Sequence, residues 1–171
     1  MNATVSLRPV TDEDRDFLLR VYDSTREEEM QLAREYSGWD DEQVEQFMAQ
    51  QFHAQDTFYR QHFPNTKMDV ILDGDRPVGR LYVDRRVDEI RVIDIALLTP
   101  CRGKGIGGQL MNEILDEGRS KNLPVRIHVQ RGNVAMHLYD RLGFKKIEEQ
   151  SVYDLMEWTP GDNGTQESES S

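Results

Sequence analysis

The chain has 171 residues, of which 37% are hydrophobic and 31% are charged, and its formal net charge is -11. This composition is typical of a globular protein with a substantial core, and the acidic balance argues against a nucleic-acid partner, whose phosphates need a basic surface. The sequence contains no run of about eighteen apolar residues, so no membrane span is predicted. Residues 1–6 lack a signal-peptide pattern, and we therefore expect a cytoplasmic location.

The N-terminal residues predict a short strand followed by a helix. Residues 5–8 form the strand, which Pro9 ends. Thr11 and Asp14 have the spacing of a capping box, so a helix is expected to begin there and to continue to about Ser24.

Two further helices are expected before the first long strand. One covers about 28–36 and ends at Gly38, and the other begins after Asp40 and continues to Pro64. Apolar residues recur at helical spacing along the second of these, and we interpret this side as core; the alternative is that its edge forms the floor of an acceptor pocket. The residues are Val44, Phe47, Met48, Phe52, Phe58 and Tyr59.

The middle of the chain predicts a hairpin, a third strand and a helix. Strands are expected over 68–72 and 78–83, and the Asp-Gly segment between them indicates a turn. The apolar, β-branched stretch 90–98 predicts the third strand, and a helix is expected after the following glycine-rich loop, to about Ser120.

The last part of the chain predicts a strand over 125–129, a helix over 134–142 and a pair of strands over 144–149 and 152–157. Gly143 is expected to end the helix in a left-handed conformation. The strand before the glycine-rich loop and the strand over 125–129 form a βαβ unit, so they should be parallel.

This element order predicts an α+β fold with a mixed sheet flanked by helices. We expect one domain over residues 1–158 and, from its composition, a disordered tail over 159–171. Cys101 is the only cysteine, which excludes an internal disulfide. With four scattered histidines, it makes a structural zinc cluster implausible, so we expect no metal.

The glycine-rich loop, residues 101–108, is the strongest functional signal. Gly103, Gly105, Gly107 and Gly108 leave backbone amides uncovered at the start of a helix, where the helix dipole is positive. Arg102 and Lys104 add two cations. The loop predicts an anion site for a phosphate group; the alternative is a tight turn whose glycines only permit close packing.

Spacing separates the known classes of glycine loop. A nucleoside-triphosphatase loop needs Ser or Thr after its Lys, whereas Lys104 is followed by Gly105. Gly103, Gly105 and Gly108 match the dinucleotide pattern, but the next strand is followed by Gln130 and Arg131 rather than by an acidic residue for the ribose. The dinucleotide alternative therefore rests on the glycine spacing alone.

Two motifs in order resemble the GNAT superfamily of N-acetyltransferases. Arg102-x-x-Gly105-x-Gly107 is similar to its pyrophosphate-binding signature, in which the last position is Gly or Ala. The segment 133–144, with Asn, Ala, Leu-Tyr and Gly-Phe in sequence, is similar to a second block of the family. The similarity extends from about Lys67 to Trp158. One departure is Thr99, where the family often has Pro.

The resemblance implies an acetyl-CoA dependent N-acetyltransferase that acts on a primary amine of a small molecule, a peptide or a protein. It implies an acceptor-side helical region over 1–66 and an acetyl-CoA-binding core over 67–158, whose central strands splay apart around pantetheine. Two alternatives are a non-catalytic acyl-CoA-binding module and the dinucleotide oxidoreductase. The acidic clusters early in the chain favour a cationic acceptor, and the sequence leaves room for a homodimer.

The resemblance also assigns site residues. The Leu97 N–H would polarise the thioester carbonyl, and Tyr139 would protonate the departing thiolate. Tyr139 could instead be a packing residue, and Asn133 could be a helix N-cap, a coenzyme contact or both. The coenzyme contacts implied are Ile95, Leu97, Leu98, Arg102, Gly103, Lys104, Gly105, Ile106, Gly107, Gly108, Asn133 and Tyr139.

Two carboxylates are candidates for the base that removes the amine's proton. Asp94 interrupts an apolar strand, so it is either a hydrogen-bonded structural residue or a base acting directly or through water. Glu89, at the start of the same strand, is the second candidate. Cys101 precedes a helix N-terminus near two cations, but the family transfers acetyl directly, so we interpret it as a packing residue.

Overall fold

The structure is a computed structural model that describes residues 4–133 and 135–161. Within these residues the chain forms two compact units. The first comprises 4–82 and Asp94–Lys104, and the second comprises Val83–Ile93 and 105–161. The predicted tail lies outside the described residues apart from 159–161, and so does Val134, the expected first residue of the last helix.

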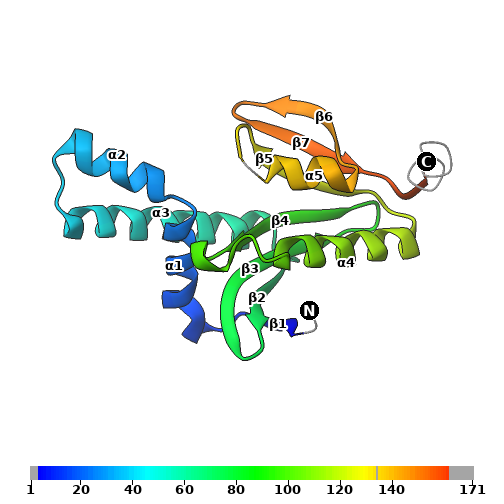
Figure 1. The fold of residues 1–171 in the computed structure, drawn as a ribbon, viewed down its shortest axis with the longest axis horizontal. Coiled ribbons are helices and arrows are strands. Elements are labelled where there is room, and N and C mark those ends of the chain that lie inside the picture. Colours follow the sequence, from blue (N-terminus) through cyan, green and yellow to red (C-terminus); the bar gives the residue numbers. More distant parts are fainter. Residues whose placement is uncertain (1–3, 134, 162–171) are drawn as a thin grey trace. The chain divides into compact units, whose positions relative to one another are not determined.

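Five α-helices and seven strands are present in the described residues (Figure 1). In chain order they are β1 (Val5–Pro9), α1 (Arg15–Ser24), α2 (Glu27–Ser37), α3 (Asp41–His62), β2 (Lys67–Asp73), β3 (Arg76–Arg85), β4 (Ile90–Leu97), α4 (Ile106–Lys121), β5 (Val125–Gln130), α5 (Met136–Leu142), β6 (Lys145–Gln150) and β7 (Tyr153–Trp158). Short 3-10 helices cover Asp12–Asp14 and Thr99–Cys101. No helix among the residues described is long and apolar enough to cross a membrane.

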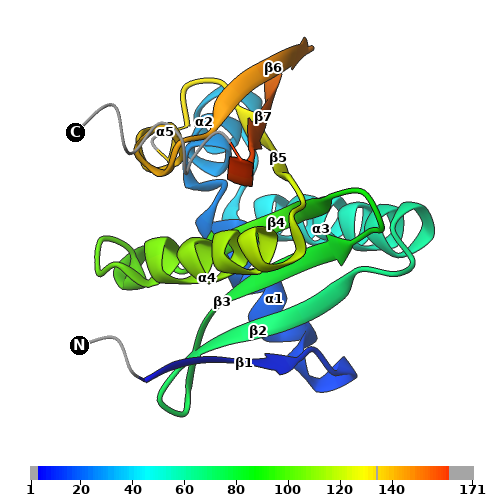
Figure 2. The ribbon, with the colours of Figure 1, turned by 90° about the vertical axis from the view of Figure 1, so that its right-hand side faces the viewer.

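The strands form one mixed sheet in the order β1-β2-β3-β4-β5-β7-β6. β1 pairs antiparallel with β2, and the two lie side by side in Figure 2. β4 and β5 pair in parallel over Ile90–Val92 and Val125–Ile127, as predicted for the βαβ unit. β7 pairs antiparallel with both β5 and β6. The predicted α+β class and mixed sheet are confirmed.

The helix ends follow the predicted capping residues. The Thr11 and Asp14 capping box is present before α1, and Asp40 caps α3 together with Gln43. Gly38 and Gly143 end α2 and α5 with φ values of 71° and 101°, a conformation that glycine adopts without steric cost.

The core of the first unit joins α1 and α3 to β2 and to the end of β4. Its buried residues are Phe17, Leu18, Val21, Tyr22, Val44, Met48, Phe52, Val70 and Ala96. The expectation that the whole apolar side of the third helix is core was wrong for two residues. Phe47 is 38% exposed and Phe58 is 47% exposed. α2, which lies along α3 in Figure 1, has no buried residue of its own.

In the second unit, α4 buries one side of its length, including Leu110, Met111 and Leu115. Gly118 lies where a Cβ atom would come within 2.9 Å of the Trp158 ring and 3.2 Å of Val125, so α4 approaches these strands closely through a glycine. The core is therefore built on a helix–strand contact that tolerates no side chain at position 118.

Gly79, the single glycine of β3, is expected to be difficult to replace. A Cβ atom there would lie 2.2 Å from the Ala96 carbonyl oxygen and 2.8 Å from the Leu97 side chain. Because a backbone atom must then move, Gly79→Ala should cost at least about 1–3 kcal/mol of unfolding free energy, measured by urea denaturation. Gly107→Ala is the matched control, since no atom lies within 4 Å of a Cβ at that position. Equal stability of the two variants would contradict this packing.

Candidate functional site

The glycine loop adopts the conformation that its composition suggests. Gly103 and Gly105 have φ values of 76° and 85°, and Gly105 is the N-cap of α4. The first helical hydrogen bond is donated by the Gln109 N–H to the Gly105 carbonyl oxygen. The amides of Ile106, Gly107 and Gly108 therefore precede the bonded part of the helix, where an anion is favoured.

The loop has room beside its backbone. A Cβ atom added at Gly103, Gly105 or Gly107 would meet no atom of the described chain within 4 Å. Glycine is therefore not required at these positions for close protein packing, although the positive φ values of Gly103 and Gly105 favour it. The open space fits the approach of a ligand phosphate to backbone amides.

Arg102 contacts backbone carbonyl groups. Its Nε donates to the Leu97 carbonyl oxygen at 3.0 Å, and its Nη2 donates to the Ser24 carbonyl oxygen at 3.2 Å. Thr99 adds a bond from its N–H to Ser24 Oγ at 2.8 Å. Thr99 and the start of the loop are thus bonded to Ser24 at the end of α1.

At the end of β4, the backbone N–H and C=O groups of successive residues point in alternate directions. The Leu98 N–H donates to the Val78 carbonyl oxygen at 2.9 Å, and the Leu98 carbonyl accepts from the Cys101 N–H at 2.8 Å. The backbone polar groups of Leu98 are therefore occupied within the protein. Because N–H groups alternate along an extended chain, the Leu97 N–H points away from β3.

Asp94 is engaged in a buried polar cluster of the first unit. Arg80 Nη2 donates to its Oδ2 at 2.5 Å, and the side chains of Arg80 and Asp94 are only 3% and 16% exposed. Tyr59 donates to the same oxygen at 3.4 Å, and Gln55 accepts from Arg80 at 2.9 Å. Burial opposes the charge of Arg80, but Asp94 together with Tyr82 and Tyr59 outweighs burial, and the Arg80 pKa is raised.

Next to this cluster, Tyr82 lies under the guanidinium of Arg80, 5.2 Å from the ring centroid. Burial raises the pKa of Tyr82 to about 12, so its phenol is neutral at physiological pH. Its hydroxyl, and Nε and Nη1 of Arg80, have no hydrogen-bond partner within residues 4–133 and 135–161.

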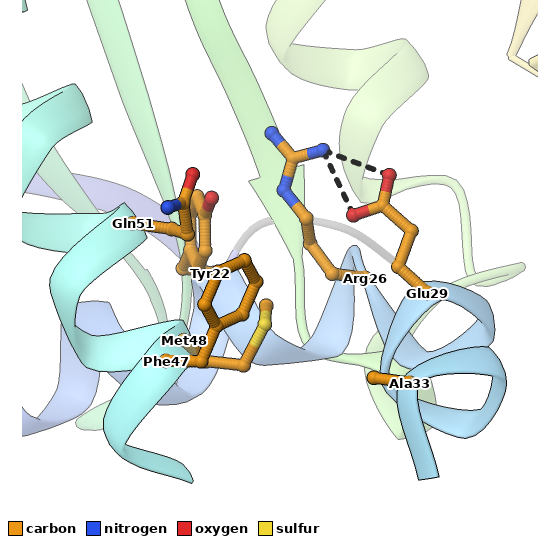
Figure 3. A pocket seen from close by; sticks show the side chains of 7 residues that line it. All are labelled: Tyr22, Arg26, Glu29, Ala33, Phe47, Met48 and Gln51. Carbon is orange, nitrogen blue, oxygen red and sulfur yellow. Dashed lines mark hydrogen bonds and ion pairs between the residues drawn. The ribbon is translucent and has the colours of Figure 1, made fainter. Parts of the chain in front are cut away.

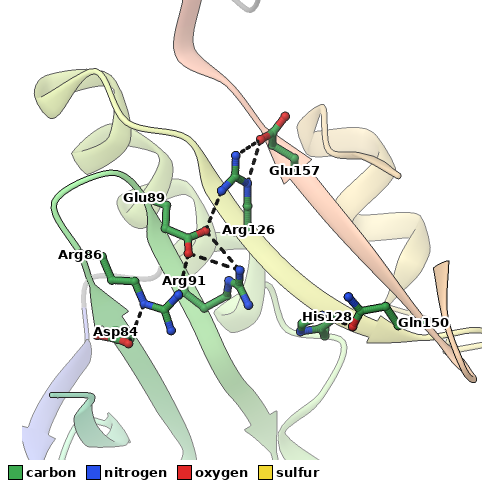
Figure 4. A network of polar contacts seen from close by, with 8 residues as sticks. All are labelled: Asp84, Arg86, Glu89, Arg91, Arg126, His128, Gln150 and Glu157. Atoms are coloured by element: carbon green, nitrogen blue, oxygen red, sulfur yellow. Dashed lines mark hydrogen bonds and ion pairs between the residues drawn. The ribbon is translucent and has the colours of Figure 1, made fainter. Parts of the chain in front are cut away.

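Glu89 lies in a network of arginines in the second unit (Figure 4). Arg86, Arg91 and Arg126 lie 2.7, 3.3 and 3.1 Å from its carboxylate oxygens. Burial alone would raise the pKa of Glu89, but the three arginines outweigh it, and the pKa lies below its ordinary value. A carboxylate held ionised in this way is a weak acceptor of protons near neutral pH.

Tyr139 and Asn133 lie in the second unit. Tyr139 is on α5, 5% exposed, with its ring edge-on to Phe144 at a centroid distance of 5.7 Å. Asn133 Oδ1 accepts from the Ala135 N–H at 2.8 Å, and the N-cap of α5 is Ala135. The Asn133 side chain thus accepts a hydrogen bond in the turn before the helix, so the N-cap alternative for Asn133 was wrong, and its coenzyme contact stays a prediction.

We did not predict from the sequence that Arg80 and Gln55 would join Asp94, and the apolar pattern assigned Tyr59 to the core. The sequence does contain an indication of this cluster, because Arg80 is a charged residue within the apolar stretch 78–83. A charge buried in such a strand needs a partner. Cys101 is buried, and the described residues contain no group of three His, Cys, Asp or Glu that could hold a metal ion.

Comparisons with known proteins agree with this architecture. The family model described as acetyltransferase (GNAT) domain matches residues 35–160. A comparison with curated proteins found no significant match. The fold is similar to that of PaiA N-acetyltransferase from Thermoplasma acidophilum in complex with coenzyme A, with a TM-score of 0.65 and 17% identity over 91% of this chain and 98% of that one.

Two other solved structures share the fold. A GNAT family acetyltransferase from Elizabethkingia anophelis with acetyl-CoA bound has a TM-score of 0.54 and 14% identity over 91% of this chain and 98% of that one. A chimera of spermidine N-acetyltransferase SpeG from Vibrio cholerae and hSSAT has a TM-score of 0.63 and 18% identity over 93% of this chain and 97% of that one. Because the family model covers most of the chain, including the glycine loop, this protein belongs to the GNAT family of acetyltransferases.

Proposed function

We propose that this protein transfers an acetyl group from acetyl-CoA to a primary amine of a small molecule, a peptide or a protein. The observation that carries the proposal is the glycine loop, in which two left-handed glycines lead into the unbonded amides of α4. The coenzyme A and acetyl-CoA complexes of two proteins of similar fold support the same ligand.

The backbone of residues 103–108 would hold the pyrophosphate of acetyl-CoA. The open space at Gly103, Gly105 and Gly107 supports this assignment, because an oxyanion has to approach the amides without meeting a Cβ atom. Lys104 is exposed and adds a cation to the loop. Arg102 would act by fixing the start of the loop through its bonds to the Leu97 and Ser24 carbonyl groups.

Acetyl-CoA supplies the thioester, and the chain's own groups would act on it from two elements. Ile95 and Leu97 would run beside pantetheine, and the Leu97 N–H would donate to the carbonyl oxygen as negative charge develops there. As the C–N bond forms and the C–S bond breaks, the Tyr139 phenol would give its proton to the leaving sulfur, and the proton lost by the attacking nitrogen would return to the phenolate through water. The products are the N-acetylated amine and the free thiol.

A protonated amine must first lose a proton to attack. We assign neither Asp94 nor Glu89 to this step, because each carboxylate is bound to arginine. The proton would instead leave to water. Asp94 would serve to hold α3 against β3 and β4 through Arg80 and Tyr59.

The acceptor would be cationic, because acidic residues begin α2 and α3. They are Glu27, Glu28 and Glu29 in α2 and Asp41 and Glu42 in α3. Attraction of this kind is screened over about 10 Å at 0.1 M salt, so the KM for the acceptor should rise between low and moderate ionic strength. A KM independent of salt, or a preference for anionic acceptors, would contradict this assignment.

Release of coenzyme A in the presence of a panel of primary amines tests the function. Turnover that requires both acetyl-CoA and an amine supports it. Binding of acetyl-CoA without turnover of any amine would leave the acyl-CoA-binding module, and stabilisation by NAD but not by acetyl-CoA would leave the dinucleotide alternative.

A further inference from the structure

Glu89 is held more tightly than an ordinary surface carboxylate. Figure 3 shows an ordinary pair, Arg26 with Glu29, beside a pocket of the first unit; the two charges lie 3.4 Å apart, and their side chains are 28% and 58% exposed. Water screens such a pair, so it contributes little to stability. The side chain of Glu89 is only 6% exposed, and three guanidinium groups share its carboxylate (Figure 4). Its charge therefore acts on these arginines with little screening.

One of the three arginines depends on Glu89 alone. Arg86 and Arg126 each contact a second carboxylate, at 2.9 and 2.7 Å. In the part of the chain that the structure describes, Arg91 has an ion pair with Glu89 only, and its Nε is buried without a hydrogen-bond partner. Loss of the Glu89 charge would therefore leave the guanidinium of Arg91 without a counter-charge, whereas the other two would each keep one.

Arg91 and Arg126 are direct neighbours across two strands. They are partners in the register of the parallel pair β4–β5, which covers Ile90–Val92 and Val125–Ile127. Two like charges at this position repel each other. Glu89 accepts from both guanidinium groups, at 3.3 and 3.1 Å. Its carboxylate thus offsets a repulsion that lies within the short paired stretch of β4 and β5.

The strand held in this way continues into the proposed acetyl-CoA site. The start of β4, to Ile93, belongs to the second unit, and the strand then runs on to Leu97 in the first. Ile95 and Leu97, which we assign to pantetheine and to the thioester carbonyl, lie in this continuation. The paired start of β4 is therefore the anchor from which these residues extend.

We infer that Glu89 is a positioning residue, whose carboxylate holds the start of β4 against β5, in the arrangement that acetyl-CoA binds, by neutralising Arg91 and Arg126. The inference rests on the proposed function and adds to it a residue that acts through the strands. Without the carboxylate, acetyl-CoA would have to restore the pairing as it binds, which lowers its apparent affinity. The later steps would proceed as in the wild type, so the effect belongs to the KM for acetyl-CoA rather than to kcat.

Steady-state kinetics of Glu89→Gln, which removes the charge and keeps the shape of the side chain, is the first measurement. The KM for acetyl-CoA should rise by about 5-fold or more, the lower end of the usual range for coupling between separate groups, and kcat should be unchanged. Glu117→Gln is the matched control, because Glu117 lies on α4, 2.7 Å from Arg85 and 2.9 Å from Lys121, outside the β4–β5 pairing. It should keep the wild-type KM.

A second substitution tests the cause of the effect. Arg91→Met, added to Glu89→Gln, removes the charge that the first substitution leaves unpaired, so the double variant should recover the wild-type KM. If Glu89→Gln does not fold, recovery of folding in the double variant supports the inference. Failure of the double variant to restore either the KM or the fold overturns it, and so does an equal rise of KM in Glu117→Gln.

Amide hydrogen exchange without ligand separates this inference from the proposed function. In Glu89→Gln, the amides of 90–92 and 125–127 should exchange faster by about 5-fold or more, whereas those of α4 should keep their wild-type rates. Faster exchange with an unchanged KM would make Glu89 a purely structural residue and overturn the inference. Unchanged exchange and KM overturn it and leave acetyl transfer standing. Faster exchange in a protein whose wild type does not bind acetyl-CoA overturns the proposed function, and with it the positioning role.

Discussion

Replacement of Tyr139 by phenylalanine is expected to reduce kcat by roughly 10²- to 10⁴-fold, the range for removal of a positioned general acid. The ring of Tyr139 is 5% exposed and packs edge-on against Phe144, and phenylalanine preserves this packing. The KM for acetyl-CoA should change far less, because the glycine loop is untouched. Steady-state kinetics with an established acceptor provides the measurement, once chemistry rather than product release is shown to limit the rate.

Tyr153→Phe is the matched control for this variant. Tyr153 lies on β7 in the same unit and is 41% exposed, so loss of its hydroxyl should alter neither kcat nor stability. If Tyr139→Phe lowers the melting temperature but retains full kcat, Tyr139 is a packing residue, and another group must protonate the thiolate.

Arg80→Met is expected to reduce the unfolding free energy by about 3–5 kcal/mol, because removal of one partner leaves the other charge buried. The partner is Asp94, whose side chain is 16% exposed and, among the described residues, would keep only the 3.4 Å hydrogen bond from Tyr59. Urea denaturation measures the loss of unfolding free energy, provided that the dependence of this free energy on urea concentration is the same in variant and wild type.

The double variant Arg80→Met with Asp94→Leu measures the energetic coupling between the two side chains. Since replacement of a buried ion pair by apolar side chains is often close to neutral, the double variant should be more stable than Arg80→Met alone. A cost under about 1 kcal/mol for the single variant, or costs that simply add, would mean that the pair is not coupled. Asp94→Asn with wild-type stability and collapsed turnover would assign Asp94 as the base.

The local elements were predictable because their signals are local. The capping residues Asp40 and Thr11 and the terminating glycines 38 and 143 act within a few residues along the chain, and the structure places helix ends at them. The parallel pairing of β4 with β5 followed from the βαβ connection. The glycine loop was recognisable for the same reason, since its conformation depends on the lack of side chains within one short segment.

Contacts between distant segments were not predictable. Periodicity predicted a buried Phe47, but its exposure depends on how far α2 covers α3, which no local pattern encodes. The bonds of Arg102 to the carbonyl groups of Leu97 and Ser24 were not indicated by the loop's own residues, and its role as an anion ligand stays a prediction. Asp94 was recognised as unusual, but its partner Arg80 lies on another strand.

The proposed function depends most on the glycine loop as the acetyl-CoA site, and a substitution at Gly107 tests this site directly. Gly107 lies in the first turn of α4 without a positive φ, and a Cβ there meets no atom within 4 Å. Gly107→Asp should therefore fold normally, because an acidic residue is favourable at a helix N-terminus. Its carboxylate would nevertheless repel a pyrophosphate held by the same amides.

Thermal denaturation with and without acetyl-CoA is the decisive measurement. For the wild type, a ligand concentration of about 100 times Kd should add about 2.7 kcal/mol to the unfolding free energy. Gly107→Ala, which the family signature permits, should keep this stabilisation, and Gly107→Asp should lose it while its melting temperature without ligand stays at the wild-type value. If Gly107→Asp is stabilised by acetyl-CoA as strongly as the wild type, the loop is not the binding site, and the proposed function loses the observation that carries it.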